Sequence, residues 1–199
     1  MKTQADRLIN FVRSHGLIRP SDLASLEIPT IALTRAVRRH QLERVGRGLY
    51  GLPERAVSSN GSLAEAARRV PKGVVCLLSA LRYHELTTQT PFEIWLAIEN
   101  KAAKPKIDYP PLRIIRFSGA ALTDGIEEHI VDGVTIRVTS VEKTVADCFK
   151  YRNKIGLDVA LEALREAWQA KRITSEGIWH YAKVCRVANV MRPYLESLA

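Results

Sequence analysis

Apolar residues near the start of the chain recur at the spacing of a helix. Ala5, Leu8, Ile9 and Val12 stand at positions i, i+3, i+4 and i+7, which places them on one face of an amphipathic helix. Gly16 follows that stripe and can take the left-handed backbone conformation that ends many helices. The pattern predicts a first helix that stops just before Gly16.

Two further helices are predicted before residue 42. Residues 17–19 are expected to form an extended connector, and residues 20–26 a second short helix that ends before Pro29. Thr30 can cap a third helix that runs to about His40.

The third helix has two chemically different faces. Leu33, Ala36 and Val37 share one face and should pack inward. The opposite face carries hydroxyl and guanidinium groups, from Thr30, Thr34, Arg35, Arg38 and Arg39.

A short hairpin should follow the three helices. Residues 42–45 and 48–52 alternate like two strands, and Gly46-Arg47 between them predicts a tight turn in which a glycine supplies the positive φ. Three helices and a basic hairpin form a winged helix-turn-helix, predicted here for residues 1–55.

This arrangement suits DNA. A helix in the major groove needs outward donors for base edges and phosphates, and an arginine at a wing tip can reach the backbone. An arginine stripe alone is more often a solvated helix face, but its place on the third helix before a basic hairpin favours DNA contact. The predicted DNA-binding residues are Thr30, Thr34, Arg35, Arg38, Arg39, Arg44 and Arg47.

The rest of the chain predicts a mixed α+β domain, residues 62–199, with a helical C-terminal part. Residues 55–61 are small and polar and mark the boundary between the two domains. Strands are expected at residues 74–77 (a strand or a lead-in), 92–98, 112–117 and 134–138. Helices are expected at residues 62–70, from a Ser79 cap to Leu86, and from a Thr139/Glu142 capping box to Arg152. Further helices are expected from an Asp158 cap onward, and at residues 175–185 and 188–198.

Charge supports a polyanionic partner. The 199 residues carry a net charge of +9, and the first 55 hold ten Lys and Arg against five Asp and Glu. A basic region of this kind favours nucleic acid over other ligands.

Catalytic and metal-binding patterns are sparse, so we expect a protein that is not an enzyme and has no cofactor or metal. Glu99 and Lys101 have the E-x-K spacing of one nuclease class, but a solvated strand end explains them better. Asp147, four residues after Lys143, is expected to be an ion-pair partner. The three cysteines are scattered, which indicates buried thiols in a reducing compartment. Without a signal peptide or an apolar run of membrane length, a cytoplasmic location is expected, with no membrane contact.

Three segments resemble the AbiEi family, the antitoxins of type IV toxin–antitoxin systems. They are Leu42–Pro53 after the three-helix pattern, Leu78–Thr87, and Val138–Asp147, in matching order. The resemblance implies a repressor of its own operon that binds double-stranded operator DNA with inverted repeats. It also implies that the C-terminal domain helps to neutralise a cognate nucleotidyltransferase-like toxin, with direct contact left open.

Two other functions stay open on the sequence alone. The winged helix could deliver a metal-dependent nuclease or other nucleic-acid enzyme to its substrate. Alternatively, the basic N-terminal fold could bind another protein.

Overall fold

The computed structural model describes residues 3–54 and 58–198 and divides into two compact units. The first comprises residues up to Pro71 together with Ile130–Ile136, and the second comprises Lys72–His129 and Arg137 onward. Residues 55–57 of the predicted boundary loop, and with them Arg55 at the end of the predicted first domain, lie outside the described residues. The domain boundary between residues 55 and 62 therefore stays a prediction.

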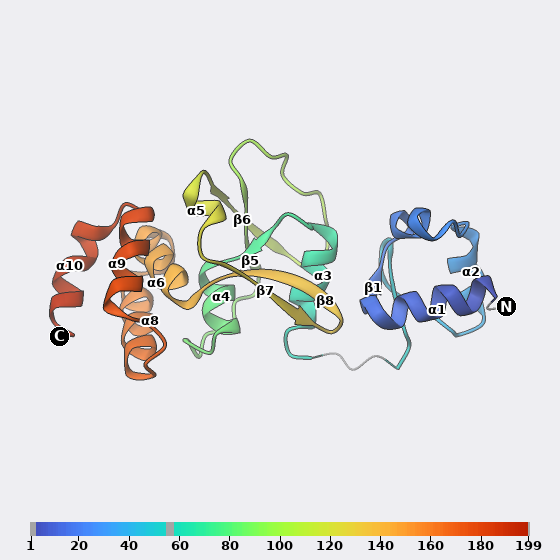
Figure 1. Cartoon of the computed structure of the whole chain (residues 1–199), viewed down its shortest axis with the longest axis horizontal. Helices are drawn as coiled ribbons and strands as arrows, with labels where there is room; N and C mark the ends of the chain where they lie inside the picture. Colours follow the sequence, from blue (N-terminus) through green and yellow to red (C-terminus); the bar gives the residue numbers. More distant parts are fainter. Residues whose placement is uncertain (1–2, 55–57, 199) are drawn as a thin grey trace. The chain divides into compact units, whose positions relative to one another are not determined.

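The first unit has the element order of a winged helix-turn-helix, followed by one more helix (Figure 1). Its elements are α1 (Gln4–His15), β1 (Leu17–Ile18), the 3₁₀ helix η1 (Pro20–Leu26), α2 (Ile31–Arg38), β2 (Glu43–Gly46), β3 (Leu49–Gly51) and α3 (Gly61–Arg69). The α+β class and the N-terminal winged helix-turn-helix are confirmed.

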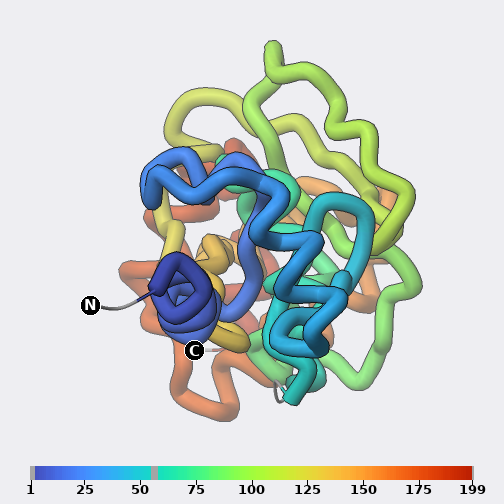
Figure 2. The backbone as a smooth tube through the Cα atoms, turned by 90° about the vertical axis from the view of Figure 1, so that its right-hand side faces the viewer, coloured from blue at the N-terminus to red at the C-terminus, as the bar shows by residue number. Residues whose placement is uncertain are grey.

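The first helix forms as the apolar spacing predicts. Thr3 caps α1 through a bond from the backbone N–H of Asp6, and the Asp6 carboxylate accepts from the backbone N–H of Thr3. Gly16 ends the helix with φ 65°. Figure 2 looks nearly along the axis of α1, in dark blue beside the N-terminal label.

A single apolar cluster holds α1, η1 and α2 together. Leu8 and Val12 of α1 meet Leu23 of η1 and Leu33 of α2 within it. Its remaining buried members are Ile18, Ile28, Ala36 and Leu42. Because each helix contributes one apolar stripe, the cluster fixes how each helix is rotated about its own axis.

Two residues of the predicted connector 17–19 form a strand, β1 (Leu17–Ile18), which corrects the sequence prediction. Leu17 and Ile18 pair with Gly51 and Tyr50 of β3, so the small sheet has three strands in the order β1-β3-β2. Two residues are too short to show an alternating pattern, and the strand exists because β3 offers it a hydrogen-bonding edge.

The second unit is built around a five-stranded sheet in the order β6-β5-β4-β8-β7. Its strands are β4 (Val74–Val75), β5 (Ile94–Glu99), β6 (Leu112–Phe117), β7 (Ile126–Val131) and β8 (Val134–Thr139). The end of β7, the turn after it and the start of β8, Ile130–Ile136, belong to the first unit. Its helices are α4 (Leu77–Tyr83), α5 (Ala120–Thr123), α6 (Val141–Lys150), α7 (Arg152–Ile155), α8 (Leu157–Gln169), α9 (Ser175–Val184) and α10 (Ala188–Glu196).

The helical C-terminal part of the prediction is confirmed. Helices α6, α8, α9 and α10 gather at one end of the second unit (Figure 1). α6 packs against α4, α8 and α9, which places it in the middle of the unit's apolar core.

Three predicted caps of this unit are wrong. Ser140, not Thr139, caps α6, because Thr139 still belongs to β8 and the Ser140 hydroxyl accepts from the backbone N–H of Lys143. Gly156 rather than Asp158 precedes α8. Ser79 lies inside α4, and its hydroxyl accepts from the backbone N–H of Trp95.

Candidate DNA-binding surface

Helix α2 is shorter than the sequence predicts. It begins at Ile31 and ends at Arg38, with Arg39 as its C-cap and His40 in the left-handed region at φ 55°. Thr30 stands at the N-cap position, but its backbone is helical and its side chain makes no capping bond, so the predicted cap is wrong in its chemistry.

The inward face of α2 agrees with the prediction in two of three positions. Leu33 and Ala36 are buried in the apolar cluster of the first unit, whereas Val37 is only half-buried at its edge. This packing turns the opposite face of the helix toward solvent.

All five predicted polar residues of the helix region are exposed. They are Thr30, Thr34, Arg35, Arg38 and Arg39. Among the described residues, no acidic side chain pairs with Arg35 or Arg38. Two acids of the unit are instead used locally, since Asp6 caps α1 and Asp22 pairs with Arg68. The guanidinium groups of α2 are therefore left free for an external anion.

The wing is a two-stranded hairpin with a bulge. Arg44 of β2 is opposite Tyr50 and Gly46 is opposite Leu49, so Val45 is the extra residue. Arg44 is exposed, and its Nε donates to the Gly46 carbonyl over 3.3 Å.

The turn of the wing is Arg47-Gly48, one residue later than predicted. Gly46 belongs to β2, and Gly48 takes the positive φ, 67°. The bulge accounts for the shift, because one extra residue in β2 moves the tip toward β3. Arg47 keeps its predicted place at the tip with an exposed side chain.

Arg69 supports the wing from outside the predicted domain. Its Nη1 donates to the carbonyl of Arg47 over 3.0 Å, and a Cβ on Gly46 would lie 2.5 Å from its Nη2. Gly46 thus leaves room for the Arg69 guanidinium, and its φ is not positive. Nothing in the spacing of the first 55 residues could have pointed to a residue on α3.

Two further contacts join α3 to the helix-turn-helix. Arg68 forms an ion pair with Asp22 of η1, and the Arg19 guanidinium donates to the Arg68 carbonyl over 3.4 Å. Together with Arg69 at the wing, these contacts make α3 a brace of the first unit.

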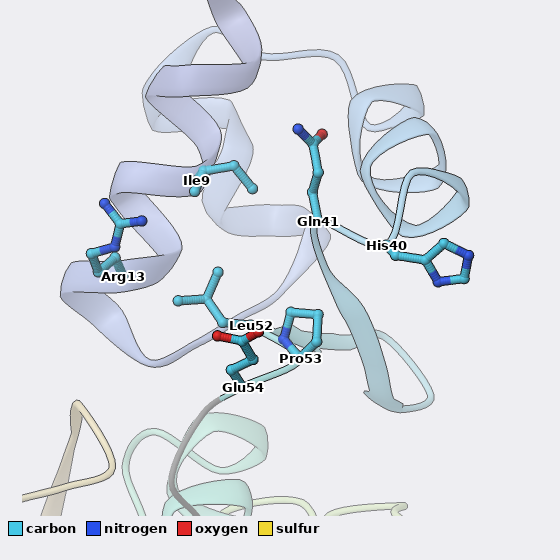
Figure 3. A pocket seen from close by; sticks show the side chains of 7 residues that line it. All are labelled: Ile9, Arg13, His40, Gln41, Leu52, Pro53 and Glu54. Carbon is cyan, nitrogen blue, oxygen red and sulfur yellow. The ribbon is translucent and has the colours of Figure 1, made fainter.

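A shallow hollow of about 470 Å³ lies on the α1 side of the unit (Figure 3). Ile9 and Arg13 of α1, His40 and Gln41 after α2, and residues 52–54 after β3 line it. Its lining mixes apolar, basic and acidic groups, so it favours no single class of ligand.

The second unit holds the predicted ion pair in its core. Lys143 Nζ lies 2.5 Å from Asp147 Oδ2, and both side chains are fully buried. Burial raises the pKa of the Asp147 carboxyl, and the Lys143 ammonium opposes that rise. The interpretation of Asp147 as an ion-pair partner is confirmed.

The cysteines and His84 are also core groups. All three cysteines are free and buried, as predicted, and burial is the main cause that raises the pKa of Cys185 to about 12. His84 Nε2 donates to the Thr139 carbonyl over 2.7 Å, and burial lowers its pKa, which favours the neutral ring. These groups stabilise the core.

The nuclease interpretation gains no support from the geometry. Glu99 is exposed at the end of β5, and its backbone carbonyl accepts from Arg116. Within residues 3–54 and 58–198, no three His, Cys, Asp or Glu side chains lie together so that they could hold a metal ion. No helix in the same ranges is both long and apolar enough to cross a membrane.

The first unit has the element order of a winged helix-turn-helix, with exposed arginines on α2 and on the wing. Residues 6–53 match the family model described as transcriptional regulator, AbiEi antitoxin. The match runs from α1 to the end of the wing, and over these residues the resemblance to the AbiEi family is confirmed. No curated protein matches the chain. The resemblance of Leu78–Thr87 and Val138–Asp147 to the family stays a prediction.

Proposed function

We propose that this protein is a sequence-specific repressor that places α2 in the major groove of its operator. The exposed stripe Thr34, Arg35 and Arg38 carries the proposal, because it stands on a helix whose other face is buried. Arg38 and Arg35 can each donate two parallel hydrogen bonds to a guanine edge, or contact phosphates. The match of residues 6–53 to a transcriptional regulator family supports this assignment.

The wing has the complementary task of positioning. Arg44 and Arg47 are exposed on the hairpin, and Thr30 and Arg39 flank α2 at its two ends. Contacts from such residues to phosphates fix the register of a protein on the duplex without reading its sequence.

The resemblance extends the proposal to a toxin–antitoxin operon. In this reading the protein represses its own operon at inverted repeats, and the second unit takes part in neutralising a nucleotidyltransferase-like toxin encoded beside it. The match to an antitoxin family supports this role.

Binding to the DNA upstream of its own gene tests the proposal. Fluorescence anisotropy should show specific binding by the wild type, and Arg35→Ala and Arg38→Ala should each lose about 1–3 kcal/mol on this DNA. Arg165→Ala removes an exposed arginine from α8 of the second unit and serves as the charge-matched control. Wild-type affinity in both α2 variants would exclude α2 as the reading helix.

A further inference from the structure

One residue of the exposed α2 stripe is not polar. Ile31, the first residue of the helix, is 51% exposed, although isoleucine is among the residues most often buried in proteins. It stands three, four and seven residues before Thr34, Arg35 and Arg38, so the four side chains form one outward row.

The structure gives Ile31 no internal packing role. Within the described residues, the apolar cluster of the first unit and the partly buried side chains around it do not include Ile31. It also takes no part in a hydrophobic staple, which pairs the residue before the N-cap with the fourth helical residue, here Pro29 and Thr34. Its side chain is therefore open to solvent and available to a partner outside the fold.

We infer that Ile31 reads the 5-methyl group of a thymine in the major groove. This inference rests on the proposed DNA binding by α2 and adds a specificity residue to it. The N-terminal residues of a recognition helix are the ones that reach base edges in helix-turn-helix proteins. Thymine alone among the four bases shows an apolar group in that groove, and an aliphatic side chain is its chemical complement.

The neighbours of Ile31 agree with this assignment. Arg35 and Arg38 on the same row suit guanine edges, and Thr34 beside them can donate or accept a single hydrogen bond. The row thus reads an operator half-site in which a thymine lies at the N-terminal end of α2 and guanines lie toward its C-terminal end.

Replacing a thymine of the operator by uracil, as deoxyuridine, tests the contact to the methyl group alone. Uracil lacks only the 5-methyl group and keeps the same hydrogen bonds. Each thymine of the operator is replaced in turn, and the affinity of the wild type is measured by anisotropy. At one thymine per half-site we expect a loss on the order of fourfold, the effect of removing one buried methyl group.

The variant Ile31→Ala completes a double-mutant cycle with that base. It should bind thymine and deoxyuridine operators equally at the sensitive position, while Thr34→Ser, which removes a methyl group from the next residue of the row, keeps the wild-type discrimination there. Because Ile31 is exposed, Ile31→Ala should keep the wild-type melting temperature, and Ile31→Val should retain most of the discrimination.

The outcomes separate this inference from the function on which it rests. The thymine contact is overturned if Ile31→Ala still distinguishes thymine from deoxyuridine as the wild type does. It is also overturned if no deoxyuridine substitution lowers the affinity of the wild type. Operator binding itself stands in both cases. A change of oligomeric state in Ile31→Ala with unchanged discrimination places Ile31 in a protein interface and overturns the thymine contact too. A wild type that does not bind the operator at all contradicts the proposed function itself.

Discussion

Lys143 and Asp147 form a buried ion pair in which each group depends on the other. The two side chains are one helical turn apart on α6, and the Cys185 thiol donates to the second carboxylate oxygen over 3.2 Å. Lys143 Nζ also lies 4.7 Å from the centre of the Phe117 ring. Each charge is tolerated in the core because the other one is present.

Replacing one of these two residues should therefore lower the free energy of unfolding more than replacing both. Lys143→Met and Asp147→Leu are each expected to lower the free energy of unfolding by about 3–5 kcal/mol, because each leaves one group without its counter-charge. The double variant Lys143→Met/Asp147→Leu should recover much of that loss, since apolar side chains of similar volume suit the surrounding core.

Urea denaturation of the four proteins measures this cycle. Glu142→Gln on the same helix is a control, because Glu142 is only half-buried. Purely additive losses would show that the two groups do not depend on each other.

The helices and strands that could be predicted from the sequence are those whose apolar residues recur at regular spacing along the element. α1 and the buried side of α2 follow from apolar residues at helical spacing, and β6 follows from its β-branched run at residues 112–117. The exposed positions of α2 follow from the same spacing, so most of the candidate site could be located without a structure.

Strands that form mainly because they pair with another strand could not be predicted in this way. β1 has two residues and exists through its pairing with β3. β7 was missed because Glu127 and Glu128 interrupt the alternation of apolar residues. A local signal was present, however, since Asp132 and Gly133 both have positive φ in the turn after β7, and Asp-Gly is a frequent hairpin turn.

Arg47 at the tip of the wing is proposed to contact the phosphate backbone of DNA. Arg47→Ala should weaken binding to operator and to scrambled DNA by similar factors, because a phosphate contact carries no sequence information. The plot of log affinity against log salt concentration should become flatter by about one unit if one phosphate contact is lost. Anisotropy titrations on both DNAs at several salt concentrations measure both effects.

Arg69 should act through the same contact, as a positioning residue that holds the Arg47 carbonyl. Arg69→Ala is expected to reproduce part of the Arg47→Ala loss and to add little to it in the double variant. Arg69→Lys should restore part of the affinity, because an ammonium can still donate to the carbonyl. Fully additive losses would instead mean that Arg69 contacts DNA on its own, and Arg165→Ala controls for the lost charge.

At the scale of the whole molecule, the proposed DNA-binding face of the first unit and the buried core of the second unit use different residues. Arg35 and Arg38 are exposed on α2 of the first unit, whereas α6 and its neighbours form the core of the second. Substitutions on the exposed face of α2 remove no buried contact, so they should leave the fold of both units intact. This separation lets repression and toxin neutralisation be tested in the full-length chain.

The double variant Arg35→Ala/Arg38→Ala should lose repression and still protect cells from the toxin. Each substitution removes about 1–3 kcal/mol of operator affinity, and neighbouring contacts add incompletely, so a loss of at least roughly tenfold is expected. Repression is measured with a reporter joined to the upstream DNA, and protection by growth while the neighbouring toxin is induced from an unrelated promoter. Arg165→Ala should retain both activities, and immunoblots establish equal protein levels. If the double variant loses protection together with repression at equal protein level, the antitoxic effect acts through DNA binding and the second unit does not neutralise the toxin by itself.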